Sequence, residues 1–397
     1  MLSIHEFDYV LPEEKIAISP HVPRDHSKLL KFRRGQISDH SFYELPNLIP
    51  ENSFLVFNES KVIRARILFE TEERKTIEIF CLEPAFGLPV QQGLEAKNKV
   101  CWNVLIGGKK KMKNDVLQLN LLVGHDSVQL NAKRIEDYSS YSVVEFSWEK
   151  NVCFSALLEQ CGKIPLPPYL NRDETTTDFF DYQTTYAQVM GSVAAPTAGL
   201  HFTDNTFRDL QNRRIAIGKI VLHVGAGTFK PVKDEDVSKH LMHEEEILVS
   251  DEFLASLLLH SGSVGAIGTT SLRTLESIYW LSEKIKSGET ERVEIKQWDD
   301  KRFPGTSSRI ENIKFLLDFM QENKVQNLRF KSSLMICPPY RFRMIDFLIT
   351  NFHQPKSTLL LLIAALVGED WKTIYSHALK SGYRFLSFGD SSVLFTN

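Results

Sequence analysis

Residues 182–202, which read YQTTYAQVMGSVAAPTAGLHF, combine small residues with side chains that are able to do chemistry. Glycine, alanine and proline recur there with neither helical nor strand periodicity. Glycine and proline at this density define a backbone path, and small side chains let that path approach a ligand closely. His201 and Thr203 stand at its exit. We therefore predict a ligand-binding loop; an ordered, turn-rich crossover is the alternative.

Three histidines are candidates for acid–base chemistry, because imidazole titrates near neutral pH. His201 ends the small-residue segment, and a histidine that only hydrogen-bonds the neighbouring backbone is the alternative. His223 precedes Gly225 and Gly227; this GxG lacks the third glycine of a phosphate loop and better suits close approach of backbone to a ligand. For His223, a site and a structural role are about equally favoured. His353 stands in a polar cluster near the C-terminus.

That polar cluster lies directly ahead of the apolar run LLLLIAALV. Thr350 and Asn351 suit hydrogen bonds to a purine edge, and Lys356 suits a phosphate or a carboxylate. Asp346 is assigned to catalysis together with the three histidines. The members of the cluster are Asp346, Thr350, Asn351, His353, Lys356 and Ser357.

Residues 268–271 read GTTS, follow an apolar strand and open a predicted helix. Free backbone N–H groups at a helix start, together with the hydroxyls of Thr269 and Thr270, favour a bound anion. Arg273 is a candidate partner for that anion. The alternative is a plain N-cap, with Arg273 paired to Glu276 at i+3.

His240, His243 and Glu244 resemble a metal cluster at first sight. However, H-x-x-H alone is a poor zinc signature, and the sequence is not HExxH. We therefore assign His243 and Glu244 to positioning of a substrate, with a structural role as the alternative. Arg24 and Asp25 follow a proline-containing turn and are assigned to the same cleft as the polar cluster at 346–357, with a mutual Arg–Asp pair as the alternative.

Basic residues interleaved with aromatic ones indicate an RNA surface, because phosphates bind the cations and unstacked bases bind the rings. Residues 340–343 (YRFR) show this pattern, with Tyr340 and Arg343 as predicted contacts. The lysine run at 109–113, which includes Lys110, is a second candidate, and a merely solvated turn is its alternative. Because the formal net charge is −3, any attraction of RNA has to come from local patches.

The elements that would position these residues fall into two groups. From residue 66 to 150, short strands separated by turns predict a small antiparallel, barrel-like domain. Strand–helix alternation elsewhere predicts an α/β main domain with a mixed or parallel sheet, made of residues 1–65 and 151–397. The small domain is thus expected as an insertion. Its expected strands are 66–70, 76–82, 100–106, 116–122, 127–130 and 142–146.

In the main domain, Thr203 is the expected N-cap of a helix at 204–213. Residues 29–42 (LLKFRRGQISDHSF) are expected to form a hairpin that turns at Arg34-Gly35. Leu359–Val367 predicts a buried core helix that is too short to span a bilayer. The polar stretch 286–332 is interpreted as an elaborated surface segment. Further expected elements are strands at 215–224 and 264–268 and helices at 252–259 and 271–285.

The composition suits an intracellular enzyme with two or three domains: 397 residues, of which 43% are hydrophobic, are enough for a sizeable core. The five cysteines form no CxxC pair, which favours reduced thiols in the cytoplasm over disulfides or a zinc knuckle. We expect no secretory signal, because the N-terminus lacks a basic region followed by an apolar one. No membrane contact and no obligate protein partner are predicted.

The sequence resembles the S-adenosylmethionine:tRNA ribosyltransferase-isomerases of the queuosine pathway along nearly its whole length. The block YQTTYAQVMGSVAAPTAGLHFT carries the likeness, and further motifs follow in order. They are FDYVLPEEKIAISPHVPRDHSKLL, LVFNESKVIRARI, IPLPPYLNRD, LHVGAGTFKPV, HLMHEE, GAIGTTSLRTLES, DFLITNFHQPKSTLLLLIAALVG and YRFLSFGD.

The resemblance implies that the ribosyl part of S-adenosylmethionine is transferred to 7-aminomethyl-7-deazaguanine in a tRNA anticodon. The ribosyl part is rearranged to an epoxycyclopentane, and adenine and methionine are released. The sulfonium charge acidifies the C5′ protons, so a base, a proton donor near adenine and an anchor for the methionine carboxylate are needed. S-adenosylmethionine is the implied cosubstrate, no metal is required, and the tRNA anticodon stem-loop is the implied partner.

The candidate residues divide among these roles. His201, His223, His353 and Asp346 are assigned to catalysis, and spacing alone does not say which histidine is the base and which the acid. Residues assigned to the cosubstrate are Ala195, Pro196, Thr197, Gly199, Gly225, Gly227, Thr269, Thr270 and Arg273. Residues assigned to the base or the RNA are Arg24, Asp25, Lys110, Tyr340, Arg343, Thr350, Asn351 and Lys356.

Three positions depart from the family pattern: Pro339 replaces a glycine, Arg64 a proline and Gln354 a leucine. They leave open a paralogue that acts on another base or RNA, while the cosubstrate motifs remain intact. Another S-adenosylmethionine enzyme, such as an RNA methyltransferase, is disfavoured because no GxGxxG turn opens a Rossmann pattern. A non-catalytic RNA-binding relative is the remaining alternative.

Overall fold

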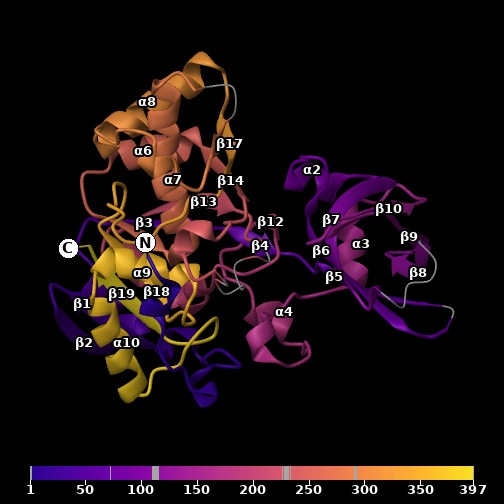
Figure 1. The fold of residues 1–397 in the computed structure, drawn as a ribbon, viewed down its shortest axis with the longest axis horizontal. Coiled ribbons are helices and arrows are strands. Elements are labelled where there is room, and N and C mark those ends of the chain that lie inside the picture. Colours follow the sequence, from indigo (N-terminus) through magenta and orange to yellow (C-terminus); the bar gives the residue numbers. More distant parts are fainter. Residues whose placement is uncertain are drawn as a thin grey trace.

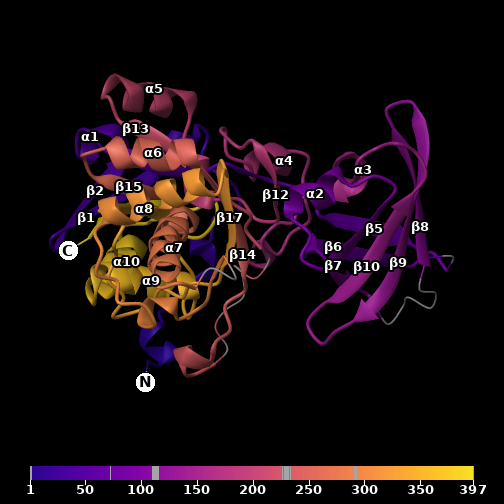
Figure 2. The same cartoon turned by 90° about the horizontal axis from the view of Figure 1, so that it is seen from above.

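The computed structural model describes residues 2–71, 73–109, 116–225, 227, 232, 234–289 and 293–396. A large mixed sheet with helices on both faces forms the main body, and a smaller antiparallel sheet stands apart from it along the longest axis of the molecule (Figures 1 and 2). The predicted α/β class is therefore confirmed for the main part of the chain.

Among the described residues, the main sheet has ten strands, and its centre is parallel. Strand β3 (Phe54–Asn58) lies between β13 (Ala216–Leu222) and β15 (Val264–Ile267), and β15 pairs with β18 (Phe347–Asn351), all parallel. On one side the sheet continues through β14 (Glu245–Ser250), β17 (Asn327–Ser332) and β16 (Glu294–Ile295). On the other it continues through β19 (Ser391–Phe395), β1 (Lys28–Arg33) and β2 (Gln36–Ser41).

Both faces of this sheet are buried, which explains why β3 reads as a continuous apolar run. Phe54 and Val56 point into the larger core, while Leu55 and Phe57 point into the core on the opposite face. The larger core is covered by α6 (Asp251–Leu259), α7 (Gly268–Lys286), α8 (Arg309–Glu322), α9 (Thr358–Val367) and α10 (Asp370–Lys380). The other face is covered by α1 (Leu45–Leu48) and α5 (Asp204–Asn212).

Several local predictions for the main body are confirmed. Thr203 caps α5, since its hydroxyl accepts a hydrogen bond from the Thr206 amide. Strands β1 and β2 form the expected hairpin, with Arg34 and Gly35 at positive φ in its turn. Helix α9 is almost entirely buried, as its apolar sequence predicts. Within the described ranges, no helix is both long and apolar enough to cross a membrane.

The interpretation of 286–332 as a surface segment is wrong. This stretch contains β16, α8 and β17, and β17 pairs antiparallel with β14 inside the main sheet. Ile313, Leu316 and Met320 of α8 are buried in the larger core. Their helical spacing was hidden by the charged residues on the exposed face of the same helix.

Among the described residues, the smaller sheet has seven antiparallel strands, and it confirms the strands expected between residues 66 and 150. In spatial order these are β11 (Gly162–Lys163), β5 (Arg66–Glu70), β6 (Thr76–Pro84), β7 (Lys99–Gly107), β10 (Ser142–Trp148), β9 (Asp126–Asp137) and β8 (Val116–Val123). Trp102, Phe146 and Phe154 fill its concave side together with α3 (Phe154–Cys161). In the described residues, β8 and β11 form the two ends of an open hydrogen-bonded order.

Short elements join the two bodies. Strands β4 (Ser60–Val62) and β12 (Val189–Ser192) pair in parallel between them, and α4 (Asp178–Asp181) lies nearby (Figure 1). Helix α2 (Val90–Glu95) belongs to the smaller body and contacts the joint. Because β3, β13, β15 and β18 run parallel, their carboxyl ends meet at one edge of the main sheet, facing this joint.

Candidate active site

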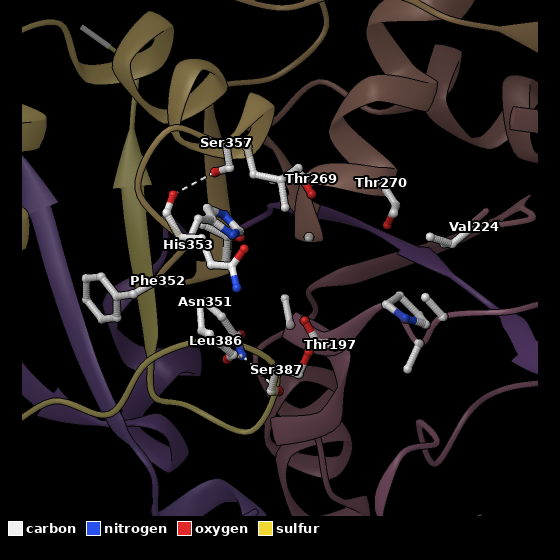
Figure 3. A pocket seen from close by; sticks show the side chains of 18 of the residues that line it. Thr197, Val224, Thr269, Thr270, Asn351, Phe352, His353, Ser357, Leu386 and Ser387 are labelled. Atoms are coloured by element: carbon white, nitrogen blue, oxygen red, sulfur yellow. Dashed lines mark hydrogen bonds between the residues drawn. The ribbon is translucent and has the colours of Figure 1, made fainter. Parts of the chain in front are cut away.

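A cleft at the carboxyl edge of the parallel strands gathers most of the predicted cosubstrate residues. This first cleft, with about 740 Å³ of empty space, lies between the segment 194–198, the start of α7 and the end of β18 (Figure 3). Its lining residues are Tyr169, Ala194, Ala195, Pro196, Thr197, Ala198, Val224, Gly268, Thr269, Thr270, Thr350, Asn351, Phe352, His353, Gln354, Ser357, Leu359, Leu386 and Ser387.

The small-residue segment forms one wall of the first cleft, as its composition predicts. Its backbone is held to the sheet, because the Val193 amide donates to the Val224 carbonyl at 3.0 Å. Gly199 lies behind the wall, where a Cβ atom would stand 1.9 Å from the Tyr186 hydroxyl oxygen. Gly199 therefore serves close packing of the loop, and the structure does not bring it into the cleft with Ala195, Pro196 and Thr197.

The first turn of α7 forms the opposite wall. Gly268 has φ of +80°, which a residue with a side chain rarely adopts, and Thr269 and Thr270 follow it into the cleft. The hydroxyl oxygen of Thr270 is buried and has no hydrogen-bond partner among the described residues. Ile267, at the N-cap position, makes no side-chain cap. The unsatisfied amides of this 19-residue helix therefore begin at the cleft, which favours an anion there.

His353 lies in the first cleft and is positioned by three hydroxyl groups. Its Nε2 lies 3.1 Å from Thr350 Oγ1, and its backbone N–H donates to the hydroxyl of Tyr375 at 3.1 Å. Its carbonyl accepts a hydrogen bond from the hydroxyl of Tyr9. Burial lowers the pKa of His353 from 6.5 to about 3. The ring is thus neutral at pH 7 and able to accept a proton.

His201 lies one layer behind the first cleft. Its Nδ1 is 2.8 Å from Ser27 Oγ, its Nε2 is 3.2 Å from Asn351 Oδ1, and its ring stacks on Phe42. Side chains thus hold it, not the neighbouring backbone as the alternative supposed. Burial lowers its pKa to about 4. Because the amide nitrogen of Asn351 donates to the carbonyls of Leu386 and Ser387, the amide of Asn351 is already engaged within the protein.

A second cleft, with about 980 Å³ of empty space, lies between the two bodies. It contains His223, Gly225, Gly227 and His243, and it shares Val224 with the first cleft. The structure therefore divides the predicted site residues between two adjoining clefts. The lining residues of the second are Leu82, Glu83, Pro84, Leu88, Val90, Leu105, Ser140, Tyr141, Gly191, His223, Val224, Gly225, Gly227, His243, Glu244, Glu245, Glu246 and Lys331.

His223 is buried at the end of β13, with 8% of its surface exposed. Its Nδ1 has no hydrogen-bond partner among the described residues. Burial, assisted by the charge of Arg329, lowers its pKa to about 4. Gly191 packs on the ring so closely that a Cβ atom there would lie 2.6 Å from His223 Cε1.

Arg273 pairs with Glu245, and its predicted alternative pairing with Glu276 is wrong. Nη1 of Arg273 lies 2.7 Å from Oε2 of Glu245, and both side chains are buried. Glu276 instead accepts hydrogen bonds from the Tyr340 hydroxyl and from the amides of Arg343 and Met344. Arg273 lines neither cleft, so an anion contact from it stays a prediction that the geometry does not favour.

Asp346 and Lys356 lie outside both clefts. Asp346 is at the opposite end of β18 from Asn351, where it accepts hydrogen bonds from the Val264 amide and from Arg309. Lys356 pairs with Asp8 at 2.8 Å.

The rival Arg24–Asp25 pair is not formed. Arg24 donates to the carbonyls of Phe180 and Gln183, and Asp25 accepts from the Thr203 hydroxyl at 2.6 Å. Neither residue lines a cleft.

The predicted RNA residues are scattered. Tyr340 is buried, and its hydroxyl accepts from Trp280 and donates to Glu276. Arg343 lies near it over the ring of Tyr279. Lys110 lies outside the described residues.

Several residues that line the first cleft were not among the predicted site residues. Tyr169, Leu386 and Ser387 come from the motifs IPLPPYLNRD and YRFLSFGD, to which no ligand role was given. The hydroxyls of Tyr169 and Ser387 hydrogen-bond each other. Both motifs are among those that resemble the family, and this resemblance could have indicated a role for them at the site. Within the described ranges, no group of three His, Cys, Asp or Glu residues is placed to hold a metal ion.

The chain is similar to known proteins over nearly its whole length. A family model described as queuosine biosynthesis protein matches residues 4–394. The S-adenosylmethionine:tRNA ribosyltransferase-isomerase of Bradyrhizobium diazoefficiens is 35% identical, with 98% of this chain and 95% of that protein covered. The enzyme of the same name from Desulfitobacterium hafniense is 36% identical, with 99% and 100% covered. A crystal structure of S-adenosylmethionine tRNA ribosyltransferase from Thermotoga maritima is 27% identical, covers 98% of this chain and 99% of that one, and has a TM-score of 0.46.

Proposed function

This chain belongs to the queuosine biosynthesis protein family, and from that membership we propose that it is an S-adenosylmethionine:tRNA ribosyltransferase-isomerase. It transfers the ribosyl part of S-adenosylmethionine to 7-aminomethyl-7-deazaguanine in a tRNA anticodon and isomerises it to the epoxycyclopentane. Adenine and methionine leave. The observation that carries the proposal is the meeting of the segment 194–198, the GTT turn at 268–270 and the TNFH segment at 350–353 in one cleft.

The first cleft is the proposed site of S-adenosylmethionine. Its apolar wall of Ala194, Ala195 and Ala198 leaves room for a bulky cosubstrate. The start of α7, with the unpartnered hydroxyl of Thr270, suits the methionine carboxylate, because free amides and the helix dipole favour an anion. Gln354, one of the departures from the family pattern, also lines this cleft.

His353 is the proposed base. Burial keeps its imidazole neutral at pH 7, which is the form that a base requires, while the pKa of about 3 makes it a weak base. The sulfonium charge acidifies the neighbouring C5′ protons, so the base has to remove a proton that the cosubstrate already makes labile. The Thr350 hydroxyl contacts the ring of His353, and the Tyr375 hydroxyl accepts from its backbone N–H. Both contacts support a defined ring position. His201 is proposed to act through Asn351, as a positioning residue.

We further propose that the smaller body is an inserted, barrel-like domain. Its predicted bounds of 66–150 are extended to residue 163, because α3 and β11 belong to the same core and sheet, so that residues 1–65 and 164–397 form the catalytic domain. The separate apolar core around Trp102 and Phe146 supports this division. The tRNA anticodon stem-loop is the proposed partner, and the cytoplasm, where tRNA is modified, is the proposed location.

The test is mass analysis of an anticodon stem-loop that carries 7-aminomethyl-7-deazaguanine, after incubation with the protein and S-adenosylmethionine. We expect an epoxycyclopentane adduct and release of one adenine and one methionine per adduct. Formation of S-adenosylhomocysteine would instead indicate a methyltransferase. Binding of both substrates without an adduct would indicate a relative that acts on another base or RNA.

A further inference from the structure

The second cleft carries an excess of negative charge. Four carboxylates line it, those of Glu83, Glu244, Glu245 and Glu246, against a single ammonium, that of Lys331. Glu245 is neutralised from behind by Arg273, and Glu246 lies 3.9 Å from Arg329. The uncompensated charge is therefore concentrated on the other two carboxylates, one from each body of the molecule.

Lys331 shows what kind of group these two carboxylates accept. Its Nζ lies between them, 3.8 Å from Glu83 Oε2 and 3.6 Å from Glu244 Oε2. Both distances exceed the roughly 2.7–2.9 Å of a strong charge-assisted hydrogen bond. All three side chains are 39–54% exposed, so the pairing is weak and an entering ammonium group can replace Lys331.

A second, independent feature of the cleft points to a ligand with a polar edge. His223 is more than nine-tenths buried and lines the cleft, yet its Nδ1 has no partner among the described residues. A buried polar atom without a hydrogen bond is costly, so a partner is expected to arrive with the ligand. Gly191 and Gly227 pack tightly against the histidine rings of this wall, because a Cβ atom at Gly191 would clash with His223 and one at Gly227 would clash with His243.

We propose that the second cleft receives the 7-aminomethyl nucleobase, with Glu83 and Glu244 pairing with its ammonium group and His223 Nδ1 bonding the edge of the ring. This inference rests on the proposed function, which supplies the ligand. A primary alkylamine is protonated at pH 7, as a lysine side chain is. The base would then adjoin the cosubstrate, because the two clefts share Val224. Closure of the cleft by residues from both bodies would make the smaller body part of base recognition.

The test uses two RNA hairpins that differ only in the target base, which is either 7-aminomethyl-7-deazaguanine or guanine. Binding is measured without S-adenosylmethionine, so turnover is not needed. We expect the wild-type protein to prefer the aminomethyl hairpin. Glu83→Gln and Glu244→Gln should each reduce that preference about fivefold, the upper range for a partly exposed ion pair, and leave binding of the guanine hairpin unchanged. Lys331→Met should increase the preference, because it removes the competing ammonium.

His223→Phe should weaken binding of both hairpins, since both bases present a purine-like edge. Glu369→Gln, a change on the exposed start of α10, is the matched control and should alter nothing. A preference that is absent in the wild type, or unchanged in both glutamine variants, would overturn the proposal.

A loss of S-adenosylmethionine affinity in Glu244→Gln, with the hairpin preference intact, would place the sulfonium or amino group of the cosubstrate there instead. Failure of the proposed function would appear separately, as no adduct from the wild-type protein in the turnover assay.

Discussion

Arg273 and Glu245 join the two clefts through a buried ion pair, with Nη1 2.7 Å from Oε2. Arg273 belongs to α7, whose first turn lines the first cleft, and Glu245 begins β14 and lines the second. Burial alone would raise the pKa of Glu245, but the charge of Arg273, helped by His243 and the Gly225 amide, lowers it to about 2. The carboxylate is therefore ionised at pH 7, and the pair ties α7 to the start of β14.

Removal of Arg273 is expected to destabilise the protein strongly. Arg273→Met leaves Glu245 as a buried, uncompensated charge, so the free energy of unfolding should fall by about 3–5 kcal/mol. Urea unfolding followed by circular dichroism measures it. The double variant Arg273→Met/Glu245→Met, which removes both charges, should lose less than the single variant. A loss below 1 kcal/mol in Arg273→Met would show that the pair is unimportant for stability.

Gly191→Ala is expected to damage the second cleft. Gly191 has φ of +143°, and a Cβ atom would lie 2.5 Å from Val90 Cγ1 and 2.6 Å from His223 Cε1. Backbone strain and overpacking should together cost about 2–4 kcal/mol of unfolding free energy, and turnover should fall. Gly35→Ala is the control, because Gly35 also has positive φ but a Cβ atom there meets nothing within 4 Å. Equal losses of turnover in the two variants would contradict a role for close packing at His223.

Local signals in the sequence predicted several elements well, because such elements depend mainly on residues that are neighbours in the chain. The N-cap at Thr203, the hairpin at Gly35 and the apolar helix α9 are of this kind. Part of the small-residue segment, residues 194–198, lines the first cleft, and ligand binding by it stays a prediction.

Predictions that depended on distant partners did less well. Arg273 of helix α7 pairs with Glu245, which lies 28 positions away on strand β14. The i+3 rule therefore pointed to the wrong carboxylate. The division of the site residues between two clefts could not be predicted either. It depends on how the smaller body packs against the ends of β13 and β14, which no sequence motif records.

Acid is expected to destabilise the protein through its buried histidines. Burial lowers the pKa of His201 and His223 to about 4 and that of His353 to about 3, from 6.5. Below pH 6.5 the unfolded chain therefore binds more protons than the folded one. The unfolding free energy should fall as the pH falls from 6.5 towards 4, by about 1.4 kcal/mol per pH unit for each histidine.

Urea unfolding at a series of pH values checks this slope. His201→Gln should reduce it by about one histidine's share, about 1.4 kcal/mol per pH unit. His125→Gln, a change at an exposed position, is the control and should leave the slope unchanged. A slope that is the same in the wild type and in His201→Gln would mean that His201 is not kept neutral by burial.

His353 and His201 should differ in what they contribute to turnover. His353→Gln removes the proposed base but keeps a polar side chain in the first cleft, so we expect kcat to fall by a factor of about 100 to 10,000 with little change in S-adenosylmethionine affinity. His201→Gln acts one layer further out, through Asn351 at 3.2 Å, and should reduce kcat less while it also weakens cosubstrate binding. Single-turnover kinetics with calorimetric binding separate the two effects. Full activity of His353→Gln would mean that His353 is not the base. The assignment would then pass to His223 in the second cleft, which is the remaining neutral, buried imidazole among the described lining residues.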